Sequence, residues 1–114
     1  MESQRESQWA RAKGFDTSCP LGPWVETGLD LETAADLTIQ LTVNGEQRQL
    51  GRTSEMIHSI EDLIVNISEA MTLLPGDVIL TGTPAGVGPL TVGDEVAVTI
   101  EGIGTLTNKV ISRG

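Results

Sequence analysis

The 114-residue sequence is poor in cysteine, aromatic residues and positive charge. Its single cysteine, Cys19, excludes an intrachain disulfide framework and favours a reducing compartment. Seven Lys and Arg against 16 Asp and Glu give a net charge of −9, which repels nucleic acid and anionic lipid alike. No apolar run approaches membrane-spanning length, and the N-terminus shows no apolar leader. We therefore expect a cytoplasmic protein without nucleic-acid or membrane partners.

The residues that are present indicate one folded domain over residues 1–114. Apolar and polar residues alternate from Leu37 to Val43, which predicts a half-buried strand. The Asn44-Gly45 dipeptide favours a type I′ turn, so residues 46–50 should return antiparallel beside that strand. Ser59 can cap a helix, and the apolar stripe after it predicts a helix over about 59–71, packed on a sheet.

Three further strands are expected downstream, at residues 77–80, 95–100 and 105–111, the last two joined by a glycine-bearing turn. The first of them is a short apolar run and should be buried. With the hairpin, the count becomes five or six mostly antiparallel strands and one main helix. The predicted fold class is α+β, mainly β.

The stretch ILTGTPAGVG, from Ile79 to Gly88, ends the third expected strand in a glycine-rich loop. It is not a nucleotide-binding P-loop, because Pro89 and Leu90 stand where Lys and Ser or Thr are required. It is not a dinucleotide fingerprint either, because no long helix comes after it. Gly82 permits close approach to the backbone, while Thr83 offers a hydroxyl, a combination that suits a carboxylate or keto oxygen. The alternative is that the glycines only form a turn.

Other candidate groups are few. Lys13, in the segment RAKGFDT, can present an ammonium group to an anion or can be a solvated surface residue. A Cys19–His58 dyad is conceivable but has no supporting local signature. No cluster of His and Cys and no close pair of carboxylates has the spacing of a metal site.

Three segments carry a family resemblance: QWARAKGFDTSCPLGPWV, the VNGE.RQ hairpin and GDVILTGTPAGVG. With them, the chain resembles the C-terminal half of the fumarylacetoacetate hydrolase family over essentially its whole length. The resemblance implies a mixed β-sandwich-like roll, usually dimeric, that binds Mg²⁺ or Mn²⁺. Members hydrolyse, decarboxylate or isomerise β-keto and enol acids, including intermediates of aromatic catabolism. The similar branch includes 2-hydroxyhepta-2,4-diene-1,7-dioate isomerases and acylpyruvate hydrolases.

The same resemblance implies roles for individual residues. Lys13 matches the lysine that faces the substrate, so it is the candidate catalytic residue. Thr83, with Gly82, matches the Gly-Thr-Pro loop that holds a substrate carboxylate or keto oxygen. Gln4 matches a substrate-contacting glutamine. Thr17 matches a threonine near the metal in some members.

The resemblance also implies what is missing. Family members carry a Glu-x-Glu pair, and an aspartate shortly before the tryptophan that matches Trp9; all three acidic ligands precede the part represented by this sequence. We therefore expect the 114 residues alone to retain little metal, to be inactive or nearly so, and to form a homodimer or need an N-terminal half. Two alternatives stay open: a non-catalytic module for dimerisation or small dicarboxylates, and one chain of a split enzyme.

Overall fold

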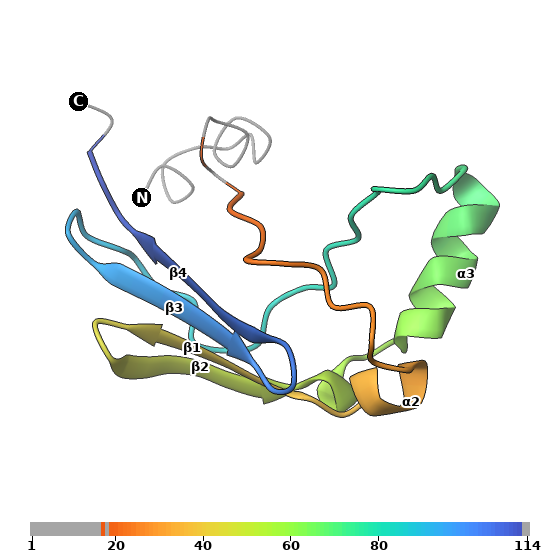
Figure 1. The fold of residues 1–114 in the computed structure, drawn as a ribbon, viewed down its shortest axis with the longest axis horizontal. Helices are drawn as coiled ribbons and strands as arrows, with labels where there is room; N and C mark the ends of the chain where they lie inside the picture. Colours follow the sequence, from red (N-terminus) through yellow and green to blue (C-terminus); the bar gives the residue numbers. More distant parts are fainter. Residues whose placement is uncertain (1–16, 18, 113–114) are drawn as a thin grey trace.

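The computed structural model describes Thr17 and residues 19–112. Its elements, in chain order, are helix α2 (Leu31–Ala34), strands β1 (Thr38–Val43) and β2 (Glu46–Arg52), the 3₁₀ turn η2 (Thr53–Glu55), helix α3 (Ile60–Ala70), and strands β3 (Glu95–Ile100) and β4 (Gly104–Lys109). The strands form one antiparallel sheet in the order β2-β1-β3-β4 (Figure 1). The predicted α+β, mainly β class is confirmed, although the described part of the chain has four strands, not five or six.

The β1–β2 hairpin turns at Asn44-Gly45, as predicted. The two residues have φ angles of 53° and 81°, the pair of positive values that a type I′ turn requires. The Asn44 side chain also reaches the start of β3, because its Nδ2 donates to Asp94 Oδ1 and its Oδ1 accepts from the Glu95 N–H, both at 2.9 Å. The turn therefore links β2, β1 and β3.

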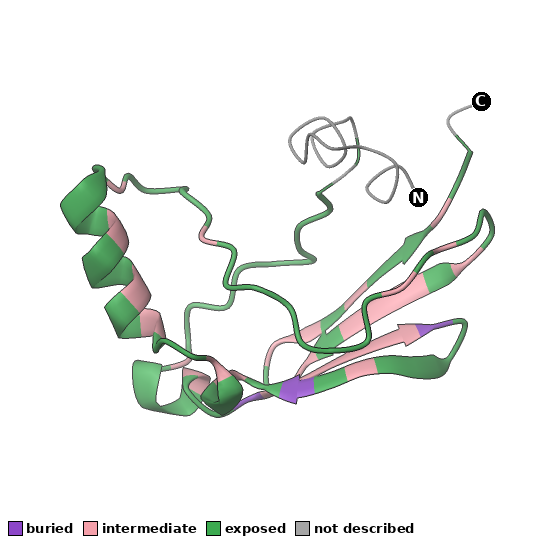
Figure 2. Ribbon diagram, turned by 180° about the vertical axis from the view of Figure 1, so that it is seen from behind, coloured by how far each residue is buried: buried purple, intermediate pink, exposed green. Residues whose placement is uncertain are grey.

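The two faces of the sheet differ in polarity. One face carries the apolar residues of β1 and β3, namely Ile39, Leu41, Val43, Val96, Val98 and Ile100. The other face carries threonines and glutamines, including the hydrogen-bonded hydroxyls of Thr99 and Thr105. In the described part of the chain only Leu37 and Val43 are buried hydrophobic residues (Figure 2). Most of the apolar face is therefore only half-buried.

Strand β2 contains one residue more than β1 over the same stretch. Leu41 pairs with Gln49 and Thr42 pairs with Gln47, which leaves Arg48 as the extra residue of a β-bulge. In a regular strand Gln47 and Gln49 would point to the same face, because side chains alternate. The bulge instead places Gln47 on the polar face with Thr42 and Gln49 on the apolar face with Leu41.

Helix α3 begins where the sequence predicts. The Ser59 hydroxyl accepts from the Asp62 N–H at 3.1 Å, and the helix ends within one residue of the expected position. The expectation that it packs on the sheet is wrong, because the chain after β2 carries the helix away from the sheet (Figure 1). Its apolar stripe is therefore only partly covered: Leu63 and Ile67 are half-buried, whereas the side chain of Ile64 is exposed.

The expected strand over residues 77–80 is also wrong. This segment is irregular, and the side chains of Val78 and Leu80 are exposed. An apolar run forms a buried strand only where neighbouring strands take its backbone hydrogen bonds, and no strand among the described residues does so. Conversely, the short helix α2 is not expected from the residue pattern; the Asp30 side chain caps it by accepting from the Thr33 N–H at 2.7 Å.

Asp94 joins two turns and should make folding sensitive to acid. Its carboxylate accepts from the Thr91 N–H at 2.8 Å and from Asn44 Nδ2 at 2.9 Å. These bonds, that from Thr91 first, lower the pKa of Asp94 below its ordinary value of 3.8. A carboxylate whose pKa is lower in the folded state stabilises the fold above its unfolded pKa, and this contribution is lost as pH falls through the folded value.

We therefore expect the thermal unfolding midpoint of the wild-type chain, followed by circular dichroism, to fall as pH drops below the ordinary aspartate range. In Asp94→Asn the fall should be shallower, because the variant has no charge to lose at this position. Glu69→Gln, at an exposed α3 carboxylate outside these contacts, is the matched control and should keep the wild-type slope. Equal slopes in Asp94→Asn and wild type would contradict the prediction.

Candidate functional site

The Gly-Thr-Pro segment lies against the apolar face of the sheet, beside β2. A Cβ added to Gly51 would lie 3.4 Å from Pro84 Cβ, so the proline packs directly on this glycine. Gly86 comes so near β2 that a Cβ there would overlap the carbonyl oxygen of Arg48. Gly82 and Gly86 have φ angles of 100° and 104°, a region that side chains disfavour. The glycines therefore let the loop follow the strand closely.

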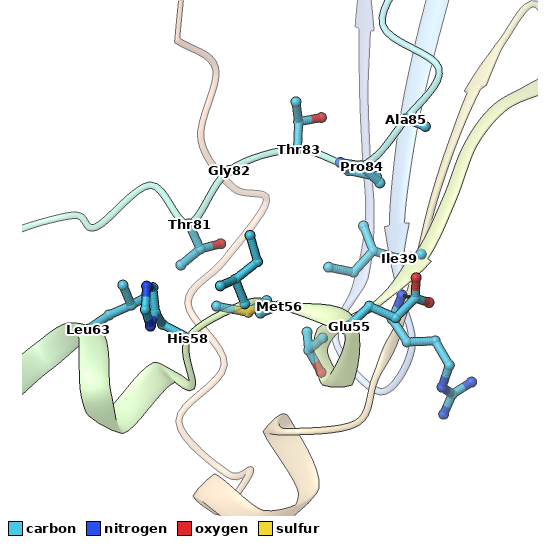
Figure 3. A pocket seen from close by; sticks show the side chains of 14 residues that line it. Ile39, Glu55, Met56, His58, Leu63, Thr81, Gly82, Thr83, Pro84 and Ala85 are labelled. Carbon is cyan, nitrogen blue, oxygen red and sulfur yellow. Dashed lines mark hydrogen bonds between the residues drawn. The ribbon is translucent and has the colours of Figure 1, made fainter.

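A hollow of about 540 Å³ separates this loop from the segment that joins β2 to α3 (Figure 3). The Thr81 side chain points toward the wall that carries Met56 and His58, whereas the Thr83 side chain points to the other side of the loop backbone. Thr83 also lines a smaller hollow of about 140 Å³ between the loop and the sheet, together with Gln49. The loop thus presents hydroxyl groups on two sides.

Gln49 connects the sheet to the loop through its side-chain amide. Its Nε2 donates to Thr83 Oγ1 and to the carbonyl oxygen of Pro84, both at 2.9 Å. An NH₂ group carries two hydrogens, so both bonds can form at once. Gln49 reaches the loop because the β-bulge turns its side chain to this face, while Gln47 bonds Gln40 on the opposite face.

Arg52 is the cationic side chain on the wall of the larger hollow, and its charge is already paired. Its Nε donates to Asp36 Oδ1 at 2.8 Å, and its Nη1 donates to Thr38 Oγ1 at 2.7 Å. The hydrogen bond with Asp36 raises the pKa of Arg52 and lowers the pKa of Asp36. Arg52 therefore has a structural role: it links the start of β1 to the end of β2.

The loop backbone offers hydrogen-bond donors that have no partner among the described residues. Within the described residues, no N–H group from Gly82 to Gly88 donates to another backbone group or to a side chain. All but the last of these residues are exposed. Exposed N–H groups beside a hydroxyl can bind a carboxylate or a keto oxygen without a formal positive charge nearby.

The structure describes only part of the predicted site. Lys13 and Gln4 lie outside the described residues, so their positions relative to the loop stay predictions. Thr17 is exposed, with φ of 63°. Gly82 and Thr83 both line the larger hollow and Thr83 also lines the smaller one, and their binding role stays a prediction.

The described residues do not fit a divalent metal ion. No group of three or more His, Cys, Asp or Glu side chains within this part of the chain is arranged to hold one.

The Cys19–His58 dyad gains no support from the described residues, and Gln49 is a site residue that the sequence did not indicate. Cys19 is exposed and His58 lines the larger hollow, but no hydrogen bond joins them within the described residues, and nothing supports a dyad. Gln49 is not among the site residues expected from the sequence, although it stands in the VNGE.RQ segment that carries the resemblance. Its contact with Thr83 depends on the bulge, which the residue pattern does not display.

The family model described as fumarylacetoacetate (FAA) hydrolase C-terminal matches residues 1–111. The chain belongs to the fumarylacetoacetate hydrolase family. This confirms the family expected from the motifs, and solved members of the family share the small α+β fold described above. Within the described residues, no helix of this family member is long and apolar enough to cross a membrane.

Two relatives indicate the breadth of the family. The chain is 58% identical over 113 residues to a Mycobacterium tuberculosis protein, covering 99% of this chain and 43% of that protein. It is 50% identical over 103 residues to the oxaloacetate tautomerase of Escherichia coli, covering 90% and 47% respectively. The chain therefore spans less than half the length of these relatives.

Solved structures show the same relationship. The structure of 5-carboxymethyl-2-hydroxymuconate delta-isomerase from Mycobacterium smegmatis matches with a TM-score of 0.89 at 55% identity, over 98% of this chain and 43% of the other. Maleylpyruvate hydrolase from Sphingobium sp. SYK-6, solved with manganese(II) and pyruvate, matches with a TM-score of 0.81 at 40% identity, over 85% and 37%. Family members thus include isomerases and hydrolases, and one is seen with a divalent metal.

Proposed function

We propose that this chain is the keto-acid-binding, C-terminal portion of a hydrolase or isomerase that acts on β-keto or enol carboxylic acids in the breakdown of aromatic compounds. The observation that carries the proposal is the loop from Gly82 to Gly88. There the Thr83 hydroxyl and several N–H groups without partners among the described residues are exposed, and Thr83 lines the smaller hollow of about 140 Å³ between the loop and the sheet. The net charge of −9 repels such an acid at long range, so recognition must rest on local donors of this kind.

The names of the similar proteins support the substrate class. Oxaloacetate, maleylpyruvate and the hydroxymuconate of the delta-isomerase are small keto or enol acids. In the proposal, Thr83 and Gly82 bind a carboxylate or keto oxygen of such an acid. Lys13 adds an ammonium charge at the reacting oxygen, and Gln4 contacts the substrate.

The metal of the proposed enzyme would be bound by residues outside the described part of the chain. We propose that Mg²⁺ or Mn²⁺ serves the assembled enzyme as a Lewis acid on carboxylates outside the residues described here, with Thr17 nearby, and that this chain alone retains none. The single cysteine fits a cytoplasmic setting for that assembly. The non-catalytic alternative is also favoured by one observation: among the described residues, donors of the loop are exposed without a metal cluster, so a binding module can work metal-free.

The experiment is a calorimetric titration of the chain with pyruvate, with and without Mn²⁺. We expect wild type to bind, and Thr83→Val to bind about tenfold more weakly, because the near-isosteric variant loses one hydrogen bond to a charged ligand. Thr81→Val is the matched control, since its hydroxyl points to the other side of the loop, and it should retain affinity.

The comparison with and without Mn²⁺ tests where the metal is held. We expect the affinity not to change with Mn²⁺, because the metal ligands are proposed to lie outside the described residues; an affinity that rises with Mn²⁺ would contradict the proposal that this chain alone retains no metal. Absence of heat with pyruvate under both conditions would overturn the proposal that the loop binds keto acids.

A further inference from the structure

We propose that Gln49 is a positioning residue that donates to the Thr83 hydroxyl oxygen and so keeps the Thr83 proton available to a ligand; the inference rests on the proposed function of the loop. A threonine hydroxyl can donate one hydrogen bond and accept others, and its rotation decides which group it serves. A substrate carboxylate or keto oxygen can only accept. Thr83 therefore binds such an oxygen well only when its proton points toward the ligand.

The orientation of the Gln49 amide is decided by its second contact. The two ends of a glutamine amide are similar in shape, and the hydrogen-bond partners decide which end is nitrogen. The carbonyl oxygen of Pro84, 2.9 Å away, can only accept, so the atom that faces it is Nε2. The same nitrogen faces Thr83 Oγ1 at 2.9 Å. Thr83 is therefore the acceptor in this pair.

An oxygen that accepts from Gln49 keeps its own hydrogen for another partner. Within the described residues, the bond from Gln49 is the single hydrogen bond of the Thr83 side chain. Thr83 is exposed, and its partner Gln49 belongs to the strand against which the loop lies. Accepting from Gln49 therefore leaves the Thr83 proton for a ligand that reaches this exposed side chain.

The backbone contributes to the same arrangement. The bulge at Arg48 places Gln49 on the face where the loop lies, and the absence of side chains at Gly51 and Gly86 lets the loop approach β2 closely. Gln47, two residues earlier on the same strand, points to the other face and bonds Gln40 at 3.0 Å. The two glutamines therefore form a natural pair for comparison: one contacts the loop and the other does not.

The test is a double-mutant cycle read by pyruvate titration on wild type, Gln49→Met, Thr83→Val and the double variant. We expect Gln49→Met to weaken binding about fivefold and Thr83→Val about tenfold. The double variant should remain near tenfold, because Gln49 acts through the hydroxyl that Thr83→Val has already removed. Gln47→Met should bind as wild type does.

Losses that multiply to about fiftyfold in the double variant would overturn the inference, since Gln49 would then act independently of Thr83. Wild-type affinity in Gln49→Met would overturn it as well. A second measurement needs no ligand: the nuclear magnetic resonance signals of the Gln49 side-chain NH₂ should shift in Thr83→Val, and an unchanged position would refute the contact. A wild-type chain that binds no pyruvate would overturn the proposed function, while these signals would still decide whether Gln49 holds Thr83.

Discussion

Gly86→Ala should displace the Gly-Thr-Pro loop from β2 and weaken pyruvate binding by at least about tenfold. An added Cβ would overlap the Arg48 carbonyl oxygen, which belongs to the strand backbone and cannot rotate away as a side chain can. The φ angle of 104° adds strain, of about 1–3 kcal/mol for a non-glycine residue in a sparsely populated region. The loop must move, and movement stretches the bonds that Gln49 makes to Thr83 and Pro84. Calorimetry with pyruvate measures the loss.

Gly88→Ala is the matched control for this substitution. It makes the same chemical change two residues later, where an added Cβ would meet no atom within 4 Å. We expect Gly88→Ala to keep the affinity and the thermal unfolding midpoint of wild type. If Gly86→Ala bound pyruvate as well as Gly88→Ala, the close approach to Arg48 would have no part in holding the loop.

The second large effect concerns turnover. We expect no measurable tautomerisation of oxaloacetate by this chain alone in the presence of Mn²⁺, and measurable turnover when it is co-expressed with the portion of the Mycobacterium tuberculosis relative that it does not match. The described residues hold no metal cluster, and their two buried hydrophobic residues are a small core for a sheet with one apolar face. A second portion would cover apolar surface and bring metal ligands. The assay measures the loss of enol absorbance.

The controls are the two portions expressed separately. Copurification on a tag placed on either portion, together with turnover, would support the proposal. Turnover by this chain alone at the rate of the mixture would contradict it, and so would a mixture that copurifies but stays inactive. Light scattering on the chain alone shows in addition whether it forms the homodimer that the family resemblance suggests.

The features that could be predicted from the sequence are those fixed by neighbouring residues. The Asn44-Gly45 turn reflects the positive φ angles that only a few residue types adopt readily, and helix α3 reflects the Ser59 cap and its apolar stripe. The glycine-rich loop that carries Gly82 and Thr83 is likewise found from its own residues, and Pro89 and Leu90 at its end exclude a nucleotide-binding P-loop. In each case the information lies within a few residues.

The features that could not be predicted depend on distant partners. The apolar run over residues 77–80 fits a strand, but no described strand pairs with it. The stripe of α3 indicates a packing face without saying what it packs on. The role of Gln49 depends on a bulge, which appears only when β2 is aligned with β1 residue by residue. Local patterns cannot report such pairings.

The bulge also determines which changes in chain length the hairpin can absorb. Pairing places Gln47 opposite Thr42 and Gln49 opposite Leu41, and Arg48 has no counterpart in β1. A deletion of Arg48 would leave both glutamines on their present faces. A one-residue insertion between Gln49 and the turn would require a wider bulge; without one, Gln49 would turn away from the loop. A deletion and an insertion at this point of the hairpin therefore have different consequences in related sequences. Loss of the unpaired residue keeps the contact between Gln49 and Thr83, whereas gain of a residue can break it.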